Sequence, residues 1–245
     1  MQIFTDPEII EIYILGIRIQ EPMTVLTDFF ITITCWSIFI SLKGYHERAP
    51  VFRLFRYFFF MMGLATLLGG IFGHAFSYAA GYQLKLPGWI CSMIAVMLAE
   101  RSSIIHSGKL HKKSISQLFS VINIVELATF IIIVCYTLNF LFVEIHAFYG
   151  LLIVFGSFEF FIYIKTKDEG SKYMLFSVGV SGLAGLVHIT HFSIHTWFNY
   201  LDLAHCLMCV SAVFLFRGVK RTSFFEVNDD AINLENNKFQ VIKKA

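Results

Sequence analysis

Residues 117–137, QLFSVINIVELATFIIIVCYT, decide the fold of this chain. The stretch holds 21 residues, and Glu126 is the only acidic or basic side chain in it. A helix needs about 20 apolar residues to cross the hydrocarbon core of a bilayer, which is roughly 30 Å thick. The stretch therefore predicts a membrane-spanning helix rather than the short apolar runs, broken by turns, that are typical of soluble α/β proteins.

Six further stretches of similar character lie before and after it. The seven expected spans are residues 24–42, 57–78, 88–106, 117–137, 142–164, 173–195 and 198–217. Residues 1–23 are expected to form a short outer helix or to lie along the interface, and residues 218–245 a polar cytoplasmic tail. The sequence thus predicts an all-α, polytopic membrane protein, with a seven-transmembrane-helix bundle over residues 24–217.

The composition excludes several other classes of protein. Hydrophobic residues make up 57% of the chain and charged residues 15%, whereas a soluble domain carries about 25% charged residues. A net charge of +2 predicts no nucleic-acid partner. The five cysteines lie in apolar stretches and predict no extracellular disulfide framework. The expected partners are membrane lipids.

The distribution of Lys and Arg predicts the orientation of the chain. With the N-terminus outside, the inner segments would hold twelve basic residues close to the spans, and the outer segments only Arg18 and Lys85. Basic loops favour the cytoplasmic side, so we expect N-out and C-in. The first residues have no basic n-region and no small-residue cleavage site, which favours direct insertion into a bacterial inner membrane.

Ionisable residues within the spans are the candidates for function, because each costs several kcal/mol in hydrocarbon. At a helix rise of about 1.5 Å per residue, most of them lie within about 10 Å of the outer ends of their spans. Glu100 and Glu126 lie deeper, near 16–18 Å by the same rise. These depths predict an outward-facing polar cavity, lined by Asp28, His74, Glu100, Glu126, His146, His188, His191, His195, Asp202 and His205.

Zinc binding is the most specific functional interpretation of this cavity. A His-x-x-x-His pair on a helix places two imidazoles one turn apart, and His191 and His195 have that spacing. His74 or His205 is expected to supply a further ligand from a facing helix. Asp202 would orient a ligand or act as the base on bound water. The competing interpretation is that histidines near a membrane boundary are merely interfacial.

The arrangement resembles the CREST superfamily, which includes the alkaline ceramidases and the adiponectin-receptor-type proteins. The points of similarity are seven spans, Glu21-Pro22 before the first span, and His74 near the end of the second. The resemblance implies a zinc-dependent intramembrane hydrolase that cleaves lipid amides. Three positions depart from the pattern. Gly70 stands where the family has Ser, Lys85 where it has Asp, and the late His-x-x-x-His is matched by His191 in the sixth span instead of the seventh.

Three functions remain open from the sequence. The first is a metal-dependent hydrolase of a lipid or amphiphile that enters the outer half of the bundle. The second is a non-enzymatic receptor, transporter or scaffold, whose buried acids and histidines bind a ligand or protons. The third is a b-type haem protein with ligands such as His74 and His188, which is disfavoured because the inner half has no comparable histidine pair.

The predicted topology can be tested with reporter fusions. A reporter at the C-terminus or in the loop around residues 43–56 should be active only in the cytoplasm, and one in residues 81–87 only outside. Opposite activity in either loop would show that the number of spans is wrong.

Overall fold

The computed structural model describes residues 9–45 and 49–222, and almost all of this part of the chain is helical. Seven helical stretches in it are long and apolar enough to cross a membrane, which confirms the predicted number. They are α1 (Pro22–Ser41), α2 (Pro50–Leu68) with the π-helix η2 (Gly69–Ala75), α4 (Leu86–His106), α5 (Lys113–Thr137), α6 (Leu141–Phe148) continued by the π-helix η5 (Tyr149–Phe155) and α7 (Gly156–Thr166), α8 (Glu169–Thr190), and α9 (Tyr200–Arg221). Short helices make up some of the connections, namely η1 (Lys43–Tyr45), α3 (Ser77–Ala80), η3 (Tyr82–Lys85) and η4 (Ser107–Lys109).

A β-hairpin precedes the first long helix. Strands β1 (Glu11–Ile14) and β2 (Ile17–Gln20) pair antiparallel, and the short helix considered for this segment is wrong for residues 11–20. Leu15 and Gly16 join the strands with φ values of 50° and 80°, the left-handed backbone that a tight two-residue hairpin turn requires. The Ser77 hydroxyl donates to the side chain of Gln20 at 2.7 Å, which fixes the hairpin to the region beyond η2.

Several predicted boundaries differ from the structure, and the largest difference is at the second span, which was expected from residue 57 but begins at Pro50. The sixth span was expected to run to residue 195, but α8 ends at Thr190 because His191 adopts a left-handed backbone with φ of 51°. The polar tail was expected from residue 218, but α9 continues to Arg221. The rest of that tail and the first eight residues lie outside the described residues.

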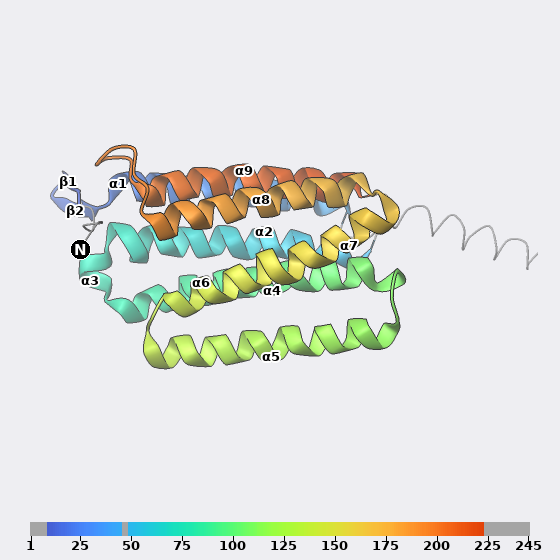
Figure 1. Cartoon of the computed structure of the whole chain (residues 1–245). Coiled ribbons are helices and arrows are strands. Elements are labelled where there is room, and N and C mark those ends of the chain that lie inside the picture. Colours follow the sequence, from blue (N-terminus) through green and yellow to red (C-terminus); the bar gives the residue numbers. More distant parts are fainter. Residues whose placement is uncertain (1–8, 46–48, 223–245) are drawn as a thin grey trace, which may run out of the picture.

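The helices form an elongated bundle (Figure 1). The hairpin, the start of α1, η2 and the α8–α9 connection gather at one end of it, called here the hairpin end. Helices α8 and α9 pack along each other, as do α2 and α4, and α1 lies between α2 and α9. Helix α5 lies at the edge of the bundle, where it packs chiefly against α4 and α6.

Large apolar side chains fill the centre of the bundle. Phe55 and Phe59 of α2 and Phe155 of η5 are almost fully buried, and the rings of Phe55 and Phe155 meet edge to face at 6.1 Å. Helix α5 contributes little to this core. Its mean hydropathy is 2.5, but only Asn123, Leu127 and Val134 of its residues are buried, so most of its apolar surface faces outward.

A polar network closes the opposite end of the bundle. His106 Nδ1 lies 3.0 Å from Glu159 Oε1, and the Ser171 hydroxyl donates to the other Glu159 oxygen at 2.8 Å. Thr222 contacts both His106 Nε2, at 3.0 Å, and Asp168 Oδ2, at 3.2 Å. These groups are buried and mutually hydrogen-bonded, so the network ties α4, α7, α8 and the end of α9 together.

Two glycines let α8 and α9 approach each other closely. A Cβ atom added at Gly170 would lie 2.6 Å from the backbone nitrogen of Thr222 and 2.7 Å from the carbonyl oxygen of Gly218. Backbone atoms cannot rotate away as a side-chain tip can. Small residues are common where membrane helices meet in this way.

Replacing Gly170 with Ala should therefore destabilise the protein by about 1–3 kcal/mol, because the added methyl group forces the two backbones apart. Gly179→Ala is the matched control on the same helix, since a Cβ there meets nothing within 4 Å. It should be neutral or stabilise the helix by about 0.5–1 kcal/mol. Thermal unfolding of both variants in detergent measures the difference, and equal midpoints would contradict the close packing.

Candidate functional site

A buried carboxylate stands at the centre of the polar residues at the hairpin end. Asp28 lies in the second turn of α1 and is 3% exposed. Its Oδ2 atom lies 3.8 Å from His74 Nε2, and its Oδ1 atom lies 3.7 Å from His205 Nε2. The two imidazole rings stand 6.2 Å apart, centroid to centroid. Three predicted site residues, from the first, second and seventh spans, therefore meet.

The other nitrogen of His205 is held by a threonine, and this contact defines the form of the ring. The Thr27 hydroxyl donates to the Thr24 carbonyl at 3.0 Å and lies 2.9 Å from His205 Nδ1. A hydroxyl has one hydrogen to donate, so Thr27 accepts from the Nδ1–H of His205. In the neutral ring Nε2 then carries the lone pair, and that lone pair faces Asp28.

The other nitrogen of His74 is held by a carboxylate. His74 Nδ1 lies 2.8 Å from Glu21 Oε2. Burial acts to raise the pKa of Glu21, but its hydrogen bond to His74 and the nearby charges of His74 and Lys85 outweigh burial, so the pKa is lowered and the carboxylate form is favoured. A carboxylate only accepts, so Nδ1 of His74 carries a hydrogen. In the charged ring Nε2 carries a hydrogen as well, and in the neutral ring, the form that a metal requires, Nε2 presents a lone pair to Asp28.

The backbone of η2 brings His74 close to α1. An added Cβ at Gly70 would lie 3.2 Å from Asp28 Cβ, so the glycine allows close contact at this point. Asp28 Oδ2 is buried and has no hydrogen-bond partner among the described residues. Wide helical turns of the π type occur frequently at functional sites, and this one carries His74 in its last turn.

Asp202 also lies at this end, and one of its two carboxylate oxygens caps a helix. Its Oδ2 atom accepts from the backbone N–H of Asn199 at 2.8 Å, and the Asn199 side chain accepts from the N–H of Leu201. The pair forms a capping box at the start of α9. Asp202 also lines a small pocket together with Glu21, Thr24 and Asn199, which neither His74 nor His205 lines.

The predicted His-x-x-x-His pair does not lie on one helix. Because α8 ends at Thr190, His191 caps the helix and its ring stacks on Tyr200 at a centroid distance of 4.4 Å. His195 lies in the connection to α9, where its Nδ1 accepts from the backbone N–H of Trp197 at 3.1 Å. The expectation that one helical face presents both imidazoles is wrong. His188 is engaged elsewhere, with its Nε2 2.7 Å from Glu144 Oε1 of α6.

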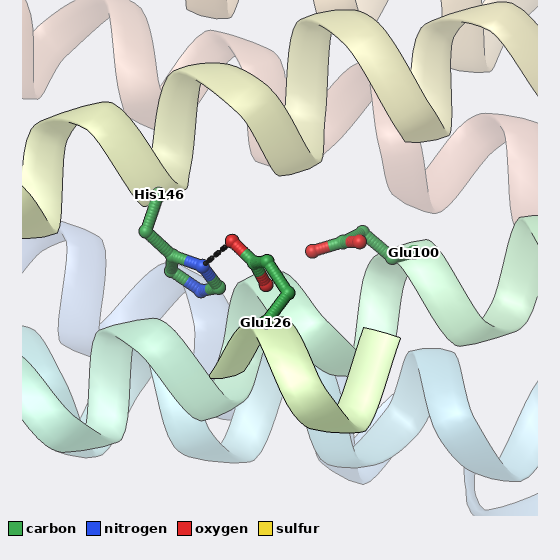
Figure 2. Close-up of side chains that lie close together, drawn as sticks. All are labelled: Glu100, Glu126 and His146. Carbon is green, nitrogen blue, oxygen red and sulfur yellow. Dashed lines mark hydrogen bonds and ion pairs between the residues drawn. The ribbon is translucent and has the colours of Figure 1, made fainter. Parts of the chain in front are cut away.

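The remaining predicted residues form a second group, on other helices. Glu100 of α4, Glu126 of α5 and His146 of α6 point toward one another (Figure 2). None of these helices supplies Asp28, His74 or His205. The sequence predicted one polar cavity lined by all of these residues, whereas the structure divides them between two clusters and other contacts.

An apolar cavity lies next to Asp28 in the interior of the bundle. Ile31 and Cys35, one and two turns after Asp28 on α1, line it, and so does Met208, three residues after His205 on α9. Its volume is about 60 Å³, and its other walls come from α2, α4, η5, α8 and α9. The lining is mainly apolar, with three serines, Ser177, Ser181 and Ser211, that hydrogen-bond to one another.

Two residues of the site were not identified as such from the sequence. Glu21 was noted only as part of a Glu-Pro pair, and Thr27 not at all. The sequence offered only their distance from Asp28. Glu21 lies seven residues before it, which is about two helical turns, and Thr27 lies directly before it. Threonines inside apolar helices commonly bond to the preceding turn, so Thr27 carried no distinct signal in the sequence.

Comparison with known proteins gives a family for most of the chain. Residues 23–223 match the family described as "Family of unknown function (DUF6962)", a range that includes Asp28, His74 and His205. No curated protein and no solved structure matches the chain. The chain therefore belongs to the DUF6962 family of unknown function.

Proposed function

We propose that the protein is a zinc-dependent membrane hydrolase that cleaves an amide or ester bond in a lipid. Asp28, His74 and His205 would hold the metal. The observation that carries the proposal is that two imidazole Nε2 atoms face one buried carboxylate, while each ring is held at Nδ1 by a polar partner.

The donor groups suit a metal ion in two respects, and binding would draw them closer together. Three lone-pair-bearing groups facing one another repel unless a cation or a proton lies between them. Zinc bound at about 2.0–2.2 Å in a tetrahedral site places neighbouring ligand atoms about 3.4 Å apart. The observed 3.7 and 3.8 Å end on two different oxygens of Asp28, and one donor atom from each of the three residues cannot be chosen so that all lie within 4.8 Å of one another, so the side chains would have to close on the ion. Metal-bound histidines usually donate their other N–H to a carboxylate or similar acceptor, the position that Glu21 and Thr27 occupy here.

The protein's own groups would then have separate tasks. Glu21 and Thr27 fix the orientation and tautomer of the two histidines. Asp202, which lines the pocket at the hairpin end, would accept the proton of the attacking water. When bound, zinc supplies Lewis-acid activation of water near neutral pH.

The apolar cavity supports a lipid as the substrate. It begins one turn from Asp28 on α1 and one turn from His205 on α9, so a small apolar group in it would lie close to the three proposed ligands. The reactive carbonyl group would lie at the polar cluster. The resemblance to the ceramidases and adiponectin-receptor-type proteins favours the same chemistry, with ligands from the second and seventh spans. We further propose the N-out, C-in orientation and a bacterial inner membrane as its location.

A receptor or transporter with a proton or ligand pocket is the second candidate. The specific observation in its favour is the buried Asp28 Oδ2 atom, which has no hydrogen-bond partner among the described residues. A proton shared between Asp28 and a histidine would relieve the same repulsion as a metal. Metal content separates the two candidates.

Metal analysis of protein purified without chelator tests the proposal. His74→Ala and His205→Ala should each lower the zinc content by one equivalent per chain, because two remaining ligands rarely hold zinc tightly. His195→Ala is the control, since His195 is exposed and lies outside the cluster. Both histidine variants should also lose hydrolysis of a fluorescent N-acylsphingosine. Unchanged zinc content in both would overturn the metal centre.

Substitutions of the residues behind the ligands should have a weaker effect. Glu21→Gln and Thr27→Val leave all three ligands in place. The first replaces the charged acceptor behind His74 with a neutral one, and the second removes the hydroxyl behind His205. We expect the zinc affinity to fall by about 10–100-fold without loss of the site. Competition with a chromogenic zinc chelator measures this change, and wild-type affinity in both variants would contradict the roles given to Glu21 and Thr27.

A further inference from the structure

The second cluster consists of Glu100, Glu126 and His146, and its three side chains are grouped as metal ligands are. One ligand atom from each residue lies within 4.8 Å of those of the other two, and the three residues come from α4, α5 and α6 (Figure 2). Glu100 is 1% exposed and His146 is fully buried. We propose that this cluster binds a divalent transition-metal ion, separate from the one proposed at Asp28.

His146 is held so that one specific nitrogen faces the acids. Its Nε2 atom lies 3.0 Å from the carbonyl oxygen of Met93. A carbonyl only accepts, so the hydrogen lies on Nε2 and the Nδ1 of the neutral ring carries the lone pair. Nδ1 lies 2.6 Å from Glu126 Oε1, a hydrogen bond that holds a proton between the two atoms, and a bound metal ion would displace that proton. A backbone carbonyl behind the ring is a common way to orient a histidine ligand.

Two carboxylate oxygens in the cluster remain without partners. Glu100 Oε1 and Glu126 Oε2 are buried and accept no hydrogen bond from the described residues. The Glu100 side chain points into the cluster, toward Glu126 (Figure 2). Uncompensated carboxylates in an apolar interior are costly, whereas a cation between them removes both the repulsion and the unsatisfied oxygens.

The neighbouring arginine does not neutralise the cluster by direct contact. Arg101 donates from Nε to the Asn123 side chain at 3.3 Å and from Nη2 to the Ser120 carbonyl at 3.1 Å. Asn123 in turn donates from Nδ2 to the Met97 carbonyl at 3.3 Å. The guanidinium is thus engaged with Asn123 and the backbone.

The ligand set defines the class of metal. One imidazole with two carboxylates suits Zn²⁺, Mn²⁺ or Fe²⁺, and the charge of two carboxylates matches a divalent ion. In a tetrahedral site with ligand distances of about 2.0–2.2 Å, neighbouring ligand atoms lie about 3.4 Å apart, so the side chains must close by up to about 1.4 Å. The metal would join α5, the helix at the edge of the bundle, to α4 and α6.

The test uses the full chain carrying His74→Ala and His205→Ala, which removes the first metal centre and keeps the two proposals distinguishable. After treatment with chelator, this protein is titrated with Zn²⁺ and, separately, with Mn²⁺. We expect one equivalent of at least one of the two ions to bind and to raise the thermal midpoint, because the ion binds only the folded state. Absence of binding and of any stabilisation by either ion would overturn the proposal.

A matched pair of variants locates the ion. In the same background, Glu126→Gln should weaken binding at least tenfold. Glu144→Gln, which replaces a half-exposed glutamate of α6 paired with His188, should leave binding unchanged. If Glu126→Gln does not fold, Glu100→Gln takes its place, because it removes an oxygen that has no partner. Equal affinity in the variant that folds and in the background protein would overturn the assignment.

Discussion

The cost of burying an ionisable group in an apolar bundle explains most of the polar architecture of this protein. Most of the buried acids among the described helices lie beside an imidazole or cap a helix, since an isolated charge there would be strongly destabilising, and Glu100 is the exception. Asp28 lies beside His74 and His205, and Glu126 beside His146. These contacts join helices that are distant in sequence, so the polar groups also fix which helices are neighbours.

The two clusters share a structural device. In each, a glycine of a π-helix packs against the carboxylate that has an unpartnered oxygen: Gly70 of η2 against Asp28, and Gly150 of η5 against Glu100. A Cβ at Gly150 would lie 2.5 Å from Glu100 Oε1. Replacing either glycine would fill the space beside the acid. The glycines therefore matter as much for access to the carboxylates as for helix packing.

The number and approximate position of the long helices could be predicted from the sequence, because length and hydropathy determine them directly. The meeting of His74 with His205 could be predicted only in part. Depth places residues at one level, but it does not say which helices are adjacent, so residues that belong to two clusters were assigned to one cavity. The prediction that His191 and His195 share one helical face was wrong, because the helix was assumed to continue past Thr190. The left-handed backbone of His191 ends α8 there.

The contact between the first and the last long helix has a consequence for biogenesis. In a chain inserted into a bilayer, Asp28 would enter with the first of the seven long helices and His205 only with the seventh. A chain inserted one span at a time would hold an unmatched acid throughout most of translation, at a cost of about 2.5–3.5 kcal/mol on the insertion scale. His74 offsets part of this cost, but the arrangement is complete only when α9 docks. A chain truncated before α9 would thus keep Asp28 on its first long helix without the contact to His205. Such a chain would be a substrate for the proteases that degrade misassembled membrane proteins.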